Sequence, residues 1–110
     1  MKLIKSIVVL FMLEFVFLTT GIDAQTPEYA KWGQVAMKET KAKYPNAEIL
    51  DYQHIGKDTE TSNSTEKFKL WLKEDQKEFG VLIEITYENQ TEKINNISFK
   101  ETTREQYNLA

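Results

Sequence analysis

The chain of 110 residues contains no cysteine and a single histidine, His54. Without cysteine, the chain has no disulfide, thiolate metal site, cysteine nucleophile or lipid-modified anchor cysteine. With one histidine, zinc sites built from several histidines are also excluded. The 14 basic residues are outnumbered by 17 acidic ones, which gives a net charge of −3. A general nucleic-acid-binding protein normally has a clustered basic excess, so we expect no nucleic acid partner.

Long hydrophobic runs are lacking, except at the N-terminus. After a basic start, an apolar stretch extends to Leu18 and is interrupted by Glu14. This stretch is shorter than the about 20 apolar residues that span a bilayer. Together with the small residue Ala24, the pattern predicts a signal peptide over residues 1–24, with an uncleaved anchor as the alternative. Residues 25–110 are then one secreted domain without a stable membrane span.

The mature chain begins with a helix signal. Thr26 suits the N-cap and Pro27 the first helical position, and Pro45 ends the helix. At about 100° per residue, mostly apolar and small residues share one face. They are Tyr29, Trp32, Gly33, Ala36, Met37, Thr40 and Tyr44. Because glycine inside a helix costs about 1 kcal/mol, Gly33 indicates a close approach to a sheet.

Four strands are expected after the helix. They are residues 47–55, 67–73, 79–87 and 93–101. The second and third alternate apolar and polar residues, which is typical of a half-buried antiparallel sheet. The polar stretch 56–65 is predicted to be a mobile connection. In the last strand Ile97 and Phe99 point inward, and residues 102–110 carry no strong signal.

The register of the second and third strands follows from their alternation, because only one pairing gathers the large apolar residues on one face. The pairs are Leu72 with Phe79, Leu70 with Val81, and Phe68 with Ile83. This register sets Lys73 opposite Glu78 and closes a four-residue loop over 74–77. It also sets Trp71 opposite Gly80, where the indole covers the bare backbone. The predicted fold class is α+β, with an N-terminal helix packed on one face of a four-stranded antiparallel meander.

Signals for catalysis are weak. His54 could act as a general base, but a base needs an orienting partner and a nucleophile, and no Gly-x-Ser-x-Gly motif is present. The acidic residues near Asp58 and Asp75 lack the spacing of a calcium loop. We therefore predict no catalytic residues, no metal site and no cofactor.

The sheet face away from the helix is the candidate binding surface. Lys69, Trp71 and Lys73 follow one strand, and Leu82 lies beside them on the next. An exposed tryptophan among lysines suits recognition of an anionic or aromatic-bearing partner through stacking and charge. Tyr52 and His54 of the first strand are expected on the same face. The alternative is that Trp71 covers Gly80 while the lysines keep the face soluble.

Four segments carry a resemblance to a known family. They read YAKWGQVAMKET (29–40), KYPNAE (43–48), FKLWLKE (68–74) and KEFGV (77–81). In these segments the chain resembles the YqzG/YhdC family, which comprises small exported proteins of Gram-positive spore-forming bacteria. The resemblance implies secretion and no established activity, so it supplies no catalytic residues.

The order of elements also resembles PepSY-type domains, in a PepSY/cystatin-like arrangement. Those domains are thought to bind or inhibit peptidases of the cell envelope. The chain departs from their turn motif, because Asn89 and Glu92 stand at its aspartate and glycine positions. The resulting hypothesis is a secreted non-catalytic binding module with an envelope or extracellular protein partner, including a peptidase that it restrains. The alternatives are a small secreted hydrolase using His54 and a structural wall or spore-coat component.

Overall fold

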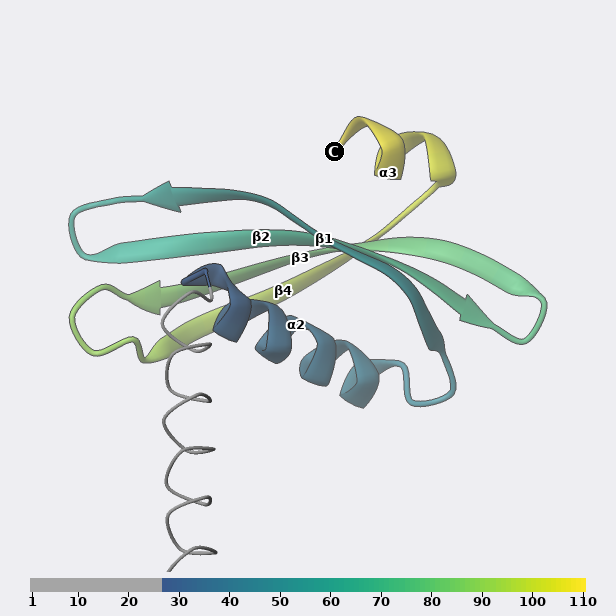
Figure 1. The fold of residues 1–110 in the computed structure, drawn as a ribbon, viewed down its shortest axis with the longest axis horizontal. Coiled ribbons are helices and arrows are strands. Elements are labelled where there is room, and N and C mark those ends of the chain that lie inside the picture. The colour runs from purple at the N-terminus through teal and green to yellow at the C-terminus, as the bar shows by residue number, and fades with distance from the viewer. Residues whose placement is uncertain (1–26) are drawn as a thin grey trace, which may run out of the picture.

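The computed structural model describes residues 27–110 and has α+β architecture (Figure 1). The elements are α2 (Tyr29–Lys43), β1 (Glu48–Thr59), β2 (Asn63–Glu74), β3 (Lys77–Glu88), β4 (Ile94–Thr102) and α3 (Arg104–Leu109). The strands form one antiparallel sheet in the order β1-β2-β3-β4, so the predicted meander is confirmed. The predicted signal peptide and Thr26 lie outside the described residues. Within 27–110, no helix is both long and apolar enough to cross a membrane.

The register of β2 and β3 agrees with the prediction. Leu72 pairs with Phe79, Leu70 with Val81, Phe68 with Ile83, and Trp71 with Gly80. The predicted four-residue loop is wrong, because the ladder continues by one pair to Glu74 and Lys77. The turn is therefore Asp75 and Gln76, and Asp75 has a φ of 57°, a conformation that aspartate tolerates better than most residues.

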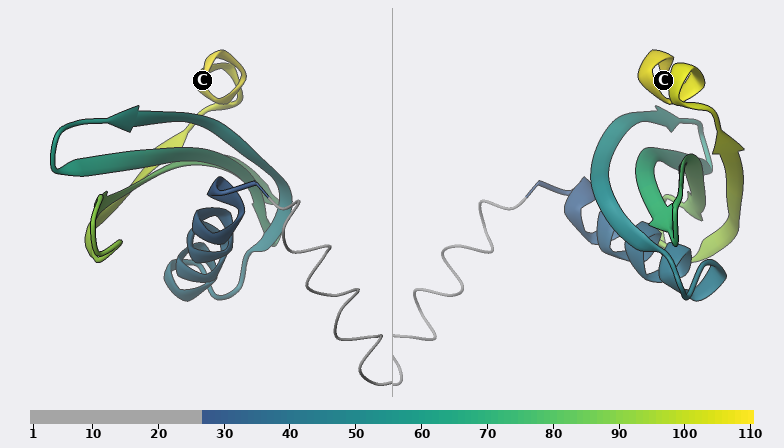
Figure 2. Two further views of the ribbon diagram at one scale, coloured as in Figure 1. Left: turned by 60° about the vertical axis from the view of Figure 1, so that its left-hand side comes forward. Right: turned by 90° about the vertical axis from the view of Figure 1, so that its right-hand side faces the viewer.

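α2 lies across the concave face of the sheet, which curves around the helix (Figure 2). Its buried residues are Trp32, Gly33, Ala36 and Thr40. They pack against a core that includes Phe68, Leu70, Leu72, Val81, Ile83 and Ile85. A Cβ at Gly33 would lie 1.9 Å from the hydroxyl oxygen of Tyr52, which confirms the close approach. Ile97 and Phe99 of β4 pack partly buried against the same core, as predicted.

The predicted end of α2 is confirmed, but its predicted start is two residues too early. The helix begins at Tyr29, two residues after Pro27, and its N-cap Glu28 makes no side-chain capping bond. The helix ends as predicted before Pro45, and the backbone N–H of Tyr44 donates to Thr40. Lysines in the last turn suit the negative end of the helix dipole.

β1 contains two irregularities, which leave Leu50 and Ile55 without a partner in β2. Each extra residue moves the alternation by one position. The predicted mobile connection is wrong, because Gly56–Thr59 pairs with β2 and only residues 60–62 form the turn. Its polar composition reflects exposure to solvent, since residues 57–62 are all exposed.

A short helix, α3, covers the convex face of the sheet opposite α2 (Figure 1). The side chain of Thr103 accepts a hydrogen bond from the N–H of Gln106, whose side chain accepts from the N–H of Thr103. This reciprocal pair is a capping box, which satisfies two N–H groups at the helix start. α3 was not predicted from the sequence, and its position on the convex face covers part of the predicted binding surface.

Candidate functional site

The predicted binding residues Lys69, Trp71, Lys73 and Leu82 lie together on the convex face, opposite α2. The expectation that Trp71 is exposed is wrong. Its side chain is 8% exposed and that of Lys69 is 7% exposed. Lys73 remains exposed, and Leu82 is half-buried. The assignment of a binding role to these four residues stays a prediction.

α3 covers Trp71 with two of its side chains. The ring of Tyr107 meets the indole edge-on at 5.1 Å, and the guanidinium of Arg104 lies 4.2 Å from the indole centre. On its other side the indole N–H donates to Glu78 at 2.7 Å. A Cβ at Gly80 would lie 3.2 Å from Trp71 and 2.9 Å from Tyr107. The predicted cover of Gly80 by Trp71 is therefore confirmed, and Tyr107 shares it.

Lys69 holds the end of α3. Its ammonium donates to the carbonyl oxygens of Tyr107 at 3.0 Å and Ala110 at 3.3 Å. A cation stabilises carbonyls that lack helical partners at a C-terminus. The hydroxyl of Tyr107 donates to Asp51 at 2.9 Å and so ties α3 to β1.

Stability at alkaline pH should report on Tyr107. Burial, followed by the hydrogen bond to Asp51, raises the pKa of its phenol to about 12. An unfolded tyrosine has a pKa near 10, so between about pH 10 and 12 the unfolded chain releases a proton that the folded chain retains. The stabilisation is complete below pH 10 and is lost as the pH rises towards 12.

The expected loss from this one phenol is about 1–2 kcal/mol across that window. Urea unfolding at pH 7, 9, 10.5 and 11.5 measures it, with Tyr107→Phe as the comparison. The variant should be less stable at pH 7 and decline less steeply above pH 10. Parallel declines in the two proteins would contradict the assignment.

Tyr52 and His54 lie on the α2 face, so the prediction that they join Trp71 is wrong. The bulge at Leu50 reverses the alternation of β1, and as a result Tyr52 pairs with Leu70 and His54 with Phe68. The imidazole stacks on Tyr29 of α2 at 4.2 Å. An ordinary alternation read from the sequence could not place it there.

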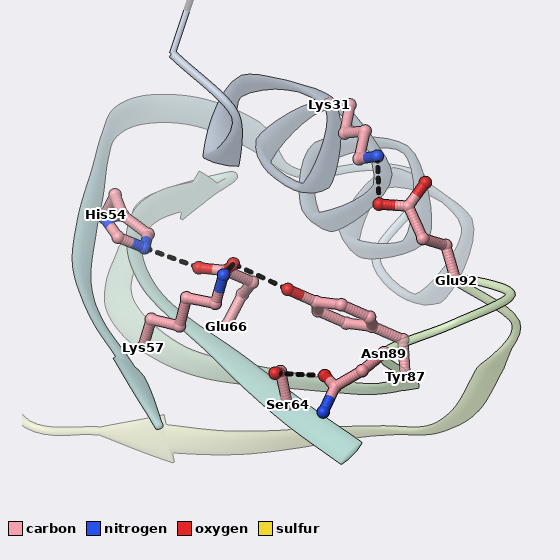
Figure 3. A network of polar contacts seen from close by, with 8 residues as sticks. All are labelled: Lys31, His54, Lys57, Ser64, Glu66, Tyr87, Asn89 and Glu92. Atoms are coloured by element: carbon pink, nitrogen blue, oxygen red, sulfur yellow. Dashed lines mark hydrogen bonds and ion pairs between the residues drawn. The ribbon is translucent and has the colours of Figure 1, made fainter. Parts of the chain in front are cut away.

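Glu66 is the centre of a polar cluster at this end of the concave face (Figure 3). Glu66 is only 2% exposed. One carboxylate oxygen lies 2.8 Å from His54 Nε2, and the other accepts from the Tyr87 hydroxyl at 3.0 Å. The ammonium of Lys57 is 3.8 Å away. Burying a carboxylate is costly unless it is paired and hydrogen-bonded, so these contacts are needed to hold it.

The groups around Glu66 also affect one another's ionisation. Burial, followed by the hydrogen bond to Glu66, raises the pKa of the Tyr87 phenol. Tyr87 is the largest cause that raises the pKa of the Lys57 ammonium, and Glu66 and Glu28 add to it. At neutral pH the cluster therefore contains a neutral phenol and a charged ammonium.

Aromatic stacking joins α2 to this cluster. The indole of Trp32 lies parallel to the ring of Tyr87, with centres 4.0 Å apart. One helical turn earlier, Tyr29 stacks on His54. Stacked pairs contribute about 0.5–1.5 kcal/mol beyond their buried area. The first two turns of α2 are thus anchored on either side of Glu66.

Between these elements lies a cavity of about 440 Å³, here called the Glu66 cavity. Its charged lining residues are Glu28, Lys31, Lys57, Glu66 and Glu92. Its other lining residues are Pro27, Trp32, Thr59, Ser64, Tyr87 and Asn89. A volume of this size is within the range of small-molecule sites, which typically combine apolar walls with a few polar groups.

The contacts of Lys31 and Asn89 shape the rim of the Glu66 cavity (Figure 3). Lys31 of α2 pairs with Glu92 of the β3–β4 turn. Asn89 accepts a hydrogen bond from the hydroxyl of Ser64, and its amide donates to the carbonyl of Glu60 at 2.9 Å. The backbone N–H of Asn89 donates to Ser62 at 2.9 Å. Asn89 therefore latches the β1–β2 turn to the β3–β4 turn.

The residues of the cluster can be compared with those of a metal site and of a catalytic site. Over residues 27–110, no group of three or more histidine or acidic side chains could hold a metal ion. His54 contacts a carboxylate, the partner that orients a general base, yet its ring lies between Tyr29 and Phe68. His54 was singled out from the sequence and Glu66 was not, although Glu66 has the same alternation phase as Phe68 and Leu70.

Comparison with known proteins identifies relatives of similar length. A family model described as "Protein of unknown function (DUF3889)" matches residues 10–101. The uncharacterized protein YqzG of Bacillus subtilis (strain 168) is 33% identical over 105 residues, which cover 90% of this chain and 96% of YqzG. A solved structure described as the NMR structure of a protein from Bacillus subtilis matches with a TM-score of 0.61 and 32% identity, over 67% of this chain and 85% of that one.

These matches support the α+β fold and the predicted resemblance to YqzG-like proteins. They do not show a PepSY relationship, which remains a resemblance in the order of elements. The family model covers most of the sequence, and the relative is matched over nearly its full length. The chain therefore belongs to the DUF3889 family, a family of proteins of unknown function.

Proposed function

We propose that the chain is a secreted, non-catalytic binding module of the cell envelope or extracellular space, and that its partner enters the Glu66 cavity. The observation that carries the proposal is the cavity itself, whose lining includes the aromatic residues Trp32 and Tyr87 and the buried carboxylate of Glu66. Sites that bind small groups commonly combine these features. The N-terminal sequence supports the location outside the cytoplasmic membrane.

The non-catalytic part of the proposal is supported by the surroundings of His54. The nitrogen Nε2 is occupied by Glu66, and Tyr29 covers one face of the ring. Within the described residues, no serine or threonine hydroxyl is hydrogen-bonded to the imidazole. A hydrolase would need such a nucleophile, or an activated water with access to the base.

The partner we propose is an envelope or extracellular protein, including a peptidase that the module restrains. A side chain of that protein enters the Glu66 cavity, because the cavity has room for a side chain but not for a whole domain. The convex face remains the competing surface, since Lys73 is exposed there. The two surfaces lie on opposite sides of the sheet, so separate substitutions distinguish them.

The test is crosslinked capture from wall extract and culture supernatant, with three variants beside the parent protein. Thr59 lines the cavity and is exposed, so Thr59→Trp should plug the cavity without disturbing the core. Gln53→Trp is its matched control, because Gln53 is exposed on the convex side of the same strand. Lys73→Glu probes the competing face.

We expect Thr59→Trp to lose the captured protein, whereas Gln53→Trp and Lys73→Glu retain it. Folding of each variant is checked by circular dichroism. Capture that survives Thr59→Trp but is lost with Lys73→Glu would overturn the cavity as the site. If a peptidase is captured, its inhibition by the parent protein can be measured directly.

A further inference from the structure

The Glu66 carboxylate has unused hydrogen-bonding capacity. A carboxylate offers about four lone-pair positions on its two oxygens. His54 and Tyr87 account for one position on each oxygen. Lys57 lies 3.8 Å away, which is beyond hydrogen-bond length. Among the described residues 27–110, no donor therefore uses about two acceptor positions of this carboxylate, which lines the cavity.

The charges that line the cavity favour a positive ligand. Three carboxylates, those of Glu28, Glu66 and Glu92, face two ammonium groups, those of Lys31 and Lys57. Lys31 and Glu92 form a pair at the rim and neutralise each other. The remainder is one unit negative, and the negative charge of Glu66 is the most deeply buried. In such a partly buried setting, a charge of the wrong sign is repelled more strongly than in water.

The walls fit a short aliphatic chain. Trp32 and Tyr87 line the cavity, and their rings stack on each other with centres 4.0 Å apart. A chain of a few methylene groups ending in an ammonium would bury its stem against these rings and bring its donors to Glu66.

We propose that the Glu66 cavity binds a primary ammonium group on a short aliphatic chain, as in a lysine side chain, with Glu66 as its ion-pair partner. This inference rests on the proposed function and names the chemical group that the cavity recognises. Lys57 then has a defined role. It is the internal cation that stands near Glu66 in the free protein, and its ammonium is mobile enough to withdraw, since its side chain is 40% exposed.

If Lys57 has this role, neutralising Lys57 and neutralising Glu66 should have opposite effects on the affinity for an ammonium ligand. Glu66→Gln keeps the shape and the hydrogen bond from Tyr87 but removes the attracting charge. Lys57→Gln removes a competing like charge. For an anionic ligand, both effects would have the reverse sign.

Two-dimensional NMR of the purified protein provides the test. The indole N–H signals of Trp32 and Trp71 act as reporter and internal control, because these residues lie on opposite sides of the sheet. The probes are Nα-acetyl-lysine amide, which mimics a lysine of a protein partner, and 1-pentylamine, a free amine. Pentanol and pentanoate are the neutral and anionic controls.

Both ammonium probes should shift the Trp32 signal saturably and leave the Trp71 signal in place. Glu66→Gln should weaken their binding at least about tenfold, and Lys57→Gln should strengthen it about threefold or more. Glu84→Gln, which alters an exposed carboxylate of the convex face, should have no effect. Binding of 1-pentylamine with a tenfold weaker response to the lysine amide would identify a free amine as the ligand.

Equal binding by Glu66→Gln and the parent protein would overturn the inference. The inference also fails if pentanoate binds and Lys57→Gln abolishes that binding, although the cavity would then still be a binding site. If no probe shifts Trp32 while Thr59→Trp still abolishes capture, the ammonium assignment alone is wrong. If no probe shifts Trp32 and Thr59→Trp also retains capture, the proposed function is wrong as well.

Discussion

Replacement of Tyr107 by alanine is expected to lower the free energy of unfolding by about 3–4 kcal/mol. Tyr107 is 4% exposed and packs on Trp71, Gly80 and Lys69. Its removal leaves a cavity between α3 and the sheet and deletes the hydrogen bond to Asp51. The Lys69 ammonium donates to carbonyl oxygens at the end of α3, and it would lose these partners if the helix detached.

Urea unfolding measures this loss, and tryptophan emission shows whether Trp71 becomes exposed to solvent. Leu109→Ala is the matched control, since Leu109 is on the same helix but is 81% exposed. We expect its effect to stay within about 0.5 kcal/mol. Equal effects of the two substitutions would mean that α3 does not seal the convex face. A loss of this size is a large fraction of the stability of a small domain.

Replacement of Trp32 by alanine should cost about 3–5 kcal/mol. Trp32 is 6% exposed, joins α2 to the core and stacks on Tyr87. Alanine would remove the stack and open the wall of the Glu66 cavity to water. The buried carboxylate would then be better solvated, but the anchor of the first turns of α2 would be lost.

Two further substitutions make this result specific. Trp32→Phe keeps an aromatic ring on Tyr87 and should cost less than half as much. Tyr29→Ala removes a neighbouring ring of α2 that is 38% exposed, and we expect a loss near 1 kcal/mol. Thermal and urea unfolding provide the values. If Tyr29→Ala were as damaging as Trp32→Ala, the general anchoring of the helix, rather than the Trp32–Tyr87 stack, would explain the loss.

The strand register was predicted correctly from the sequence where two regularly alternating strands are joined by a short turn. The pairs of β2 and β3 follow from their apolar residues alone, because a shift by one position would turn the core outward. The helix face was also predictable, and Gly33 correctly indicated the contact that Tyr52 makes. In both places local pattern and tertiary packing point to the same answer.

The candidate site could not be predicted in the same way, because it depends on departures from regularity. The bulges of β1 bring His54 and Lys57 to the side of Glu66, and nothing in the alternation marks Leu50 or Ile55 as extra residues. The partners of Glu66 come from different strands and meet only once the register is known. An acidic residue in phase with an apolar face was the one local signal available.

The exposure of Trp71 was predicted wrongly for a different reason. The covering helix α3 is only six residues long, too short for a periodic pattern. The spacing of Thr103 and Gln106 does match a capping box, which could have indicated a helix start. Without that helix, a tryptophan on an outer sheet face has no visible cover.

The meander has a consequence for the order in which the domain assembles. Each strand pairs with the one just before it, so every hairpin can close as soon as its second strand has emerged during synthesis. α3 follows the last strand, and its Arg104 and Tyr107 cover Trp71. In a chain that folds as it emerges, the convex face therefore stays wet until the whole sheet is built, and its closure marks the completed domain.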